Sequence, residues 1–133
     1  KRFENPLDDV ESLKIDTKGN IIEIGQKTNN LNEIQGQYIG LMKFNSKGTK
    51  ILLDFYQKCR EKSEKGENPL NPKIEFKKSY FTDLLQGLVT EGNELKPIFI
   101  NGGWLEFDTI NDFELYEKMI ENNSLGELIN FDR

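Results

Sequence analysis

The chain has 133 residues, of which 18 are Lys or Arg and 23 are Asp or Glu, so its formal net charge is −5, and it contains one Cys and no His. The lack of histidine excludes a Ser-His-Asp or Cys-His catalytic system and a His-bearing zinc site within this chain, and the single Cys59 excludes an internal disulfide. The negative charge argues against general binding to nucleic acid or to an anionic membrane, so small molecules or proteins are the expected partners.

The composition, with 35% hydrophobic and 31% charged residues, is typical of one soluble globular domain, which we expect to be cytoplasmic. The longest apolar runs are far shorter than the roughly 18 residues that a membrane-spanning helix requires, so we expect no membrane insertion. The chain starts without a Met and without the apolar core of a signal peptide, which is typical of a cut or incomplete edge.

A β-hairpin is expected near the start of the chain. Residues 10–15 are a short mixture of apolar and polar residues, residues 16–20 contain turn formers, and the residues from 21 to 24 supply a returning strand. After a polar, Asn-rich segment, residues 36–44 are apolar and rich in β-formers, and they predict a buried strand.

Three later segments have the periodicity of amphipathic helices. The first is predicted to be capped by Ser46 and to end near Lys62, and the third opens at Thr109. The second has the clearest pattern, since its apolar residues recur at i, i+3, i+4, i+7 and i+8: Phe81, Leu84, Leu85, Leu88 and Val89. Between the first two, residues 63–72 are charged and contain Gly and Pro, which predicts an exposed, mobile loop that tolerates deletions.

Two short extended segments are expected before the last helix. Residues 97–100 and 104–107 favour strands, and the sequence Asn-Gly-Gly between them favours a tight turn. Residues 125–129 are compatible with a short tail helix. Because predicted strands and helices alternate along the chain, the fold class is expected to be α/β or α+β.

Residues 102–109 are the first candidate for a functional site. In an extended segment the side chains of Trp104, Glu106 and Asp108 point to one side, and the apolar residues between them point to the other side, toward the core. A pair of carboxylates suits Mg2+, which takes a few oxygen ligands and keeps waters and substrate phosphates at its other positions. On the pattern alone the simpler alternative is favoured, in which Asp108 and Thr109 cap the next helix and Glu106 is solvated.

A second candidate is the segment 79–83 at the start of the clearest helix. Free backbone N–H groups at a helix N-terminus attract anions, although Asp83 would compete for them, and capping by Ser79 or Thr82 is the favoured alternative. Three aromatic side chains could also line a pocket for a cationic head group, although most aromatic residues simply form core: Tyr38, Tyr80 and Trp104.

Four blocks of the sequence, in the right order, resemble segments of the C-terminal half of nucleotidyltransferases of the phosphocholine cytidylyltransferase-like group, which act in bacterial capsule, surface-polysaccharide and phosphonate pathways. The blocks are residues 1–9, 36–41, 81–86 and 102–109. The resemblance covers nearly the whole chain. It implies an α/β fold in which residues 1–133 are the mixed-sheet, acceptor-binding and metal-binding C-terminal portion of a Rossmann-like nucleotidyltransferase, without the N-terminal nucleotide-binding half.

The resemblance implies attack by a phosphate or phosphonate oxygen of the acceptor on the α-phosphorus of CTP, with pyrophosphate leaving and Mg2+ as the cofactor. It also implies that Asp108, which matches the family's second metal aspartate, is the catalytic metal ligand, and that Glu106 binds an acceptor amine or a second metal. The further residues implied in substrate binding are Lys27 near the acceptor phosphate, Glu33 near an acceptor amine or hydroxyl, Tyr38, Tyr80 and Trp104 around the acceptor pocket, and Asp83 at its floor.

Two alternatives stay open: a sugar-1-phosphate nucleotidyltransferase, and a non-catalytic binding or oligomerisation module derived from the same family. The sequence also leaves open the nucleobase, the formation of a homo-oligomer, and the acceptor, for which phosphocholine, aminoethylphosphonate and phosphoglutamine are candidates. The glycine-rich nucleotide loop of the family is absent from this sequence, so we expect this chain alone to be inactive.

Overall fold

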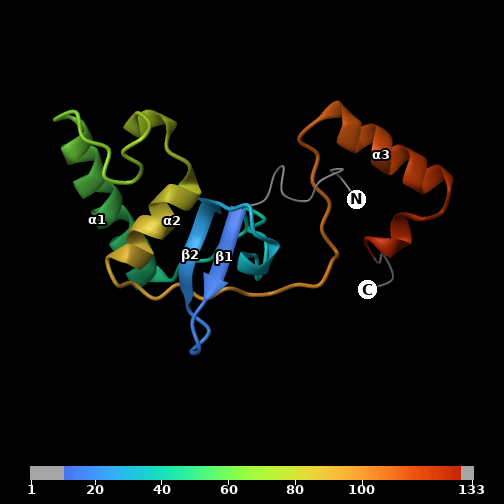
Figure 1. The fold of residues 1–133 in the computed structure, drawn as a ribbon, viewed down its shortest axis with the longest axis horizontal. Coiled ribbons are helices and arrows are strands. Elements are labelled where there is room, and N and C mark those ends of the chain that lie inside the picture. Colours follow the sequence, from blue (N-terminus) through green and yellow to red (C-terminus); the bar gives the residue numbers. More distant parts are fainter. Residues whose placement is uncertain (1–10, 130–133) are drawn as a thin grey trace. The chain divides into compact units, whose positions relative to one another are not determined.

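The computed structural model of the chain describes residues 11–129, apart from the side chain of Glu33 (Figure 1). The first resemblance block, residues 1–9, therefore lies outside the described residues. The described chain divides into two compact units, one that includes residues 11–97 and one that includes residues 98–129. Each unit is considered by itself below.

The predicted hairpin is confirmed in the first unit. Strands β1 (Glu11–Ile15) and β2 (Ile21–Lys27) pair in an antiparallel manner, with Lys14 opposite Glu23. One Asp16 carboxylate oxygen accepts hydrogen bonds from the backbone N–H groups of Lys18 and Asn20, each at 2.8 Å, which closes the turn. A short Asx-type turn of this kind needs only neighbouring residues, which is why the sequence pattern identifies it.

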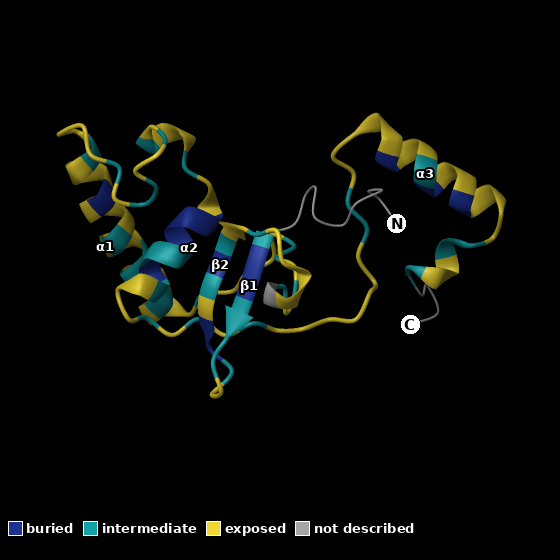
Figure 2. Cartoon of the chain, in the orientation of Figure 1, coloured by how far each residue is buried: buried dark blue, intermediate teal, exposed yellow. Residues whose placement is uncertain are grey.

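Of the two helices in this unit, α2 (Phe81–Thr90) packs against β2, and α1 (Ser46–Ser63) contacts α2 (Figure 1). The cap of α1 is Asn45 rather than the expected Ser46, because the Asn45 side chain accepts from the Gly48 backbone N–H at 2.7 Å. Figure 2 shows buried positions on β1, β2 and α2. The buried apolar cluster joins these three elements and consists of Leu13, Ile21, Ile24, Leu85 and Leu88.

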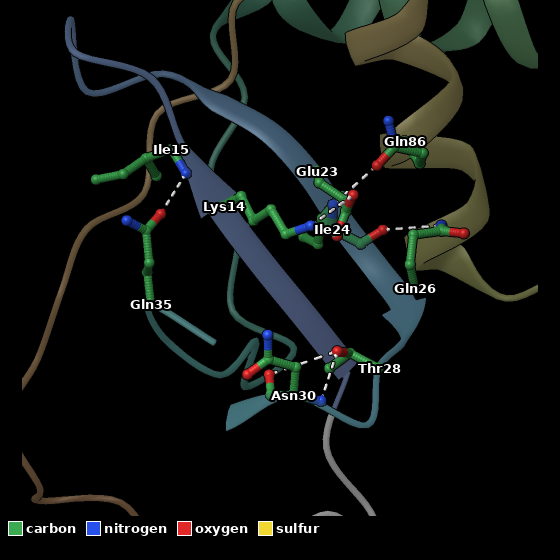
Figure 3. Close-up of polar contacts among 9 residues, drawn as sticks. All are labelled: Lys14, Ile15, Glu23, Ile24, Gln26, Thr28, Asn30, Gln35 and Gln86. Atoms are coloured by element: carbon green, nitrogen blue, oxygen red, sulfur yellow. Dashed lines mark hydrogen bonds and ion pairs between the residues drawn. The ribbon is translucent and has the colours of Figure 1, made fainter. Parts of the chain in front are cut away.

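Within residues 11–129, the backbone groups at the two outer edges of the hairpin form hydrogen bonds with side chains and loops and not with further strands (Figure 3). On the β1 edge, the Gln35 backbone N–H donates to the Leu13 carbonyl at 2.9 Å, and the Gln35 side chain accepts from the Ile15 N–H at 2.6 Å. On the β2 edge, the Gln86 side chain from α2 accepts from the Ile24 N–H at 2.8 Å. The strand expected at residues 36–44 is not formed in the described chain. An isolated parallel bridge pairs Ile34, which precedes that segment, with Leu13 of β1.

The second unit contains α3 (Ile110–Glu121), which starts one residue after the expected cap, Thr109. Residues 97–100 and 104–107 are extended but form no strand, so these two strand predictions are wrong for the described structure. The expected tail helix is a single 3-10 turn, Leu125–Glu127. An extended segment becomes a strand only when a neighbouring chain completes its backbone hydrogen bonds.

The described structure is therefore a small α/β arrangement of a two-stranded antiparallel sheet and three α-helices. The larger mixed sheet of a Rossmann-like fold is not formed by residues 11–129, and that part of the expectation stays a prediction. Within the same residues, none of the helices combines the length and the apolar character that crossing a membrane requires.

Candidate functional site

The eight candidate residues fall in both units. Trp104, Glu106 and Asp108 belong to the second unit, and the other five belong to the first: Lys27, Glu33, Tyr38, Tyr80 and Asp83. In the first unit, a hydrogen bond from the Tyr80 backbone N–H to Asp83 joins two of these residues. An aromatic pocket made of Tyr38, Tyr80 and Trp104 would draw on both units, so it stays a prediction.

A reciprocal cap orders the backbone next to Asp108. The Thr109 hydroxyl accepts from the Asp112 backbone N–H at 3.3 Å, and one Asp112 carboxylate oxygen accepts from the Thr109 N–H at 2.7 Å and from the Asp108 N–H at 3.1 Å. The capping alternative is thus right for Thr109, with Asp112 as its partner. Asp112 is buried and Asp108 is exposed, so the capping carboxylate and the candidate metal ligand are different residues.

An aromatic contact holds Phe107, the residue that precedes Asp108. The Phe107 ring packs edge-to-face on Tyr116 of α3, with ring centroids 4.9 Å apart. Phe107 is nevertheless 60% exposed, so the expectation that it enters the core is wrong for this unit. The Asp108 backbone therefore lies between a residue that contacts α3 and a residue that caps it.

Glu106 and Asp108 are the candidate metal ligands of this segment. Glu106 is half-buried, and Asp108 is exposed and lies in the bend just before α3. Residues 11–129 contain no group of three or more His, Cys, Asp or Glu side chains arranged to hold a metal. Mg2+ commonly uses one or two carboxylates and takes its remaining oxygen ligands from water and substrate phosphates, so a Mg2+ site at Glu106 and Asp108 stays a prediction.

In the first unit, Asp83 orders the start of α2. Its side chain is 6% exposed, and one carboxylate oxygen accepts from the Tyr80 backbone N–H at 2.8 Å. The other oxygen accepts from the Asn71 side-chain amide at 3.2 Å. The capping expected from Ser79 or Thr82 is thus performed by Asp83, while Tyr80, just before the helix, keeps a 69% exposed side chain.

The three remaining candidates lie on or after the hairpin. Lys27 is the exposed last residue of β2, and Glu33 belongs to the 3-10 turn Leu31–Glu33. Tyr38 packs against the apolar core, and its hydroxyl lies 3.8 Å from the Met42 sulfur. Burial raises the pKa of the Tyr38 hydroxyl above its ordinary value, so this group is a neutral hydrogen-bond donor at physiological pH.

Sequence reasoning missed the amide side chains that hold these segments in place. Asn68 and Asn71 tie the loop after α1 to the start of α2, and Gln86 bonds the edge of β2. The Asn-x-x-Asn spacing in a Pro-containing loop is a signal for local turns, but it does not identify the distant partner of either side chain.

Comparison with known proteins agrees with the class of protein that the sequence blocks suggested. Over 115 residues, or 86% of its length, the chain is 39% identical to the CTP:phosphoglutamine cytidylyltransferase of Campylobacter jejuni. The resemblance to cytidylyltransferase-like nucleotidyltransferases is thereby confirmed. The matched region is 43% of that relative, so the chain spans less than half of the relative's length. No protein-family model matches the chain, and no solved structure matches it.

Proposed function

We propose that the protein containing this chain is a Mg2+-dependent cytidylyltransferase that condenses CTP with a small phosphorylated acceptor and releases pyrophosphate. The observation that carries the proposal is the 39% identity over 86% of the chain to an enzyme named for this chemistry. Phosphoglutamine is the acceptor in that enzyme's name and the first candidate here, followed by phosphocholine and aminoethylphosphonate. The product would serve surface-polysaccharide modification.

Residues 1–133 are proposed to be the acceptor- and metal-binding C-terminal half of the catalytic domain. Two observations support this division: the chain corresponds to 43% of its relative, and its sequence has no glycine-rich loop that could hold the CTP phosphates. Nucleotide binding is then assigned to the other half, and this chain alone is expected to be inactive.

The proposed reaction forms one P–O bond and breaks another. An acceptor phosphate oxygen attacks the α-phosphorus of CTP, and the bond from that phosphorus to the bridging oxygen of the β-phosphate breaks, so pyrophosphate leaves with the electron pair. Because both reactants are polyanions, positioning and charge neutralisation supply most of the acceleration. A bound Mg2+ would neutralise charge on the phosphates.

The residues of this chain would act by holding groups in place. Asp108, with Glu106 beside it, would supply carboxylate oxygens to the metal, while Thr109 and Asp112 keep the Asp108 backbone fixed. A carboxylate on ordered backbone loses little entropy when it binds an ion.

In the first unit, the acceptor contacts would come from polar and aromatic side chains. Lys27 is assigned to the acceptor phosphate and Glu33 to an amine or hydroxyl. Tyr80 and Tyr38 are assigned to acceptor binding, and the buried Asp83 orders the segment beside Tyr80. In the second unit, Trp104 is assigned to acceptor binding.

The test is pyrophosphate release by the full-length protein with CTP, Mg2+ and one acceptor at a time. We expect release with at least one of phosphoglutamine, phosphocholine and aminoethylphosphonate. Asp108→Ala is expected to lower kcat by about a hundredfold or more, because transition-state charge stabilisation is lost. Asp54→Ala is the matched control, since Asp54 is an exposed aspartate on α1, and it should retain wild-type turnover.

Each other outcome has a separate meaning. Wild-type turnover in Asp108→Ala removes Asp108 from the metal site. Release with hexose 1-phosphates alone makes the protein a sugar-1-phosphate nucleotidyltransferase. No release with any acceptor or nucleotide overturns the proposal and favours a binding or oligomerisation module.

A further inference from the structure

The loop between α1 and α2 is tied together by the side chain of Asn68. Its amide nitrogen donates to the Ile74 carbonyl and to the Ser79 hydroxyl, each at 2.9 Å. Its oxygen accepts from the backbone N–H groups of Leu70 and Asn71, at 3.0 and 3.2 Å. Both ends of the Asn68 amide are therefore engaged, and the residue connects the loop to the segment that begins α2.

Asn71 makes the second connection, and its partner is the buried carboxylate of Asp83. The Asn71 amide nitrogen donates to one Asp83 oxygen at 3.2 Å, while the Asn71 oxygen accepts from the Lys73 backbone N–H at 3.2 Å. The other Asp83 oxygen accepts from the Tyr80 N–H. Removing the Asn71 donor leaves a nearly buried carboxylate oxygen without this hydrogen bond, which is costly for a charged group.

These contacts fix the backbone under Tyr80, whose side chain is 69% exposed. The backbone N–H of Tyr80 is held by Asp83, and the preceding Ser79 is held by Asn68. An exposed aromatic side chain on fixed backbone can contact a ligand with a smaller loss of conformational entropy than one on a free loop.

We propose that Asn71, supported by Asn68, is a positioning residue that sets the affinity for the acceptor by holding Asp83 and Tyr80 in place. This inference rests on the proposed function. It revises the expectation that residues 63–72 tolerate deletion, because the last part of that loop belongs to the support of the segment 79–83.

Three variants of the full-length protein separate positioning from stability. Asn71→Ala removes the donor to Asp83 and the acceptor for Lys73. Asn71→Asp keeps the acceptor for Lys73 but places a carboxylate against Asp83. Asn93→Ala is the matched control, since the Asn93 amide donates to the Leu88 carbonyl at 3.0 Å at the opposite end of α2.

The measurement is kcat and KM for the acceptor and for CTP, together with the unfolding midpoint of each variant. We expect both Asn71 variants to raise the acceptor KM by about tenfold, the size expected for one lost hydrogen bond to a charged group. The KM for CTP should stay within about twofold of wild type, as expected for an interaction that touches only one substrate. Asn93→Ala should lower the unfolding midpoint and leave the acceptor KM unchanged.

Three results would overturn the inference, and they are distinguishable. If the wild type is active, an equal change of the acceptor KM in Asn71→Ala and Asn93→Ala would show that Asn71 only forms a turn. A normal acceptor KM in Asn71→Asp would show the same. A wild type without transfer to any phosphorylated acceptor overturns the proposed function, and the positioning role with it.

Discussion

The two units differ in how their order is produced. The unit that includes residues 11–97 has a continuous apolar core between the hairpin and α2, and its sheet edges are closed by Gln35 and Gln86. In residues 98–129, one aspartate and two large apolar residues are buried, while many large apolar side chains are exposed, including Ile98 at 88%, Ile110 at 70% and Phe113 at 50%. Among residues 98–129, the contacts that order this unit include a helix cap, one aromatic pair and a hydrogen bond from the Gly103 N–H to the Leu128 carbonyl.

This difference bears on function because the candidate metal ligand lies in the second unit. A substitution in the first unit should lower the stability of a cooperative core, whereas a substitution at the cap in the second should act locally, near Asp108. Three predictions test this comparison, from the largest expected effect to the smallest.

Gly25→Ala is expected to have the largest effect on stability. Gly25 has a φ of +73°, and an added Cβ would overlap the Thr82 Cβ, so β2 and α2 would have to separate. We expect a loss of about 3 kcal/mol or more in the free energy of unfolding, measured in urea, because overpacking and backbone strain combine.

Gly40→Ala is the matched control for this substitution. Gly40 also has a positive φ, +77°, but no atom lies within 4 Å of the added Cβ. Its cost should be about 1 kcal/mol, from backbone strain alone. Equal losses for the two variants would show that contact between β2 and α2 contributes little to the core.

Asp112→Ala is expected to act locally. It removes the carboxylate that accepts from the Asp108 and Thr109 N–H groups, at a cost of about 1 to 2 kcal/mol for the cap. Hydrogen exchange should accelerate at residues 108–113, while the urea midpoint of the first unit stays unchanged. On the proposed function, the Mg2+ concentration for half-maximal activity of the full-length protein should rise. A wild-type Mg2+ requirement in Asp112→Ala would show that the helix cap does not influence metal binding by Asp108.

The smallest effect is expected at the hairpin turn and depends on pH. Hydrogen bonds to the Asp16 carboxylate lower its pKa below the usual value, and the largest contribution comes from the Asn20 backbone N–H. A lowered folded-state pKa contributes stability above the unfolded-state pKa, and this contribution disappears as the pH falls through the folded-state pKa. The stability difference between wild type and Asp16→Asn should therefore shrink below about pH 4, the ordinary range for aspartate.

A pH-independent gap between wild type and Asp16→Asn would indicate that the turn depends on the shape of the side chain and not on its charge.

Features that depend on neighbouring residues could be predicted from the sequence. The turn at Asp16, the apolar periodicity of α2 and the cap at Thr109 each involve residues within a few positions of one another. The candidate segments for the site were also found from short stretches of sequence, through their resemblance to segments of a known family. Their spatial relation across the two units could not be predicted, because no local pattern encodes it.

The sequence by itself determined the hairpin, the three helices and the acidic, histidine-free chemistry of the chain, because periodicity, caps and composition are local properties. Only the tertiary structure decided that residues 36–44 and 97–100 are not strands, since a strand requires a partner with free backbone groups. It also decided the pairing of Gln86 with Ile24, 62 residues apart, and of Asn71 with Asp83. Such contacts form only after the core has brought distant segments together, which is why the support of the candidate site was not visible in the sequence.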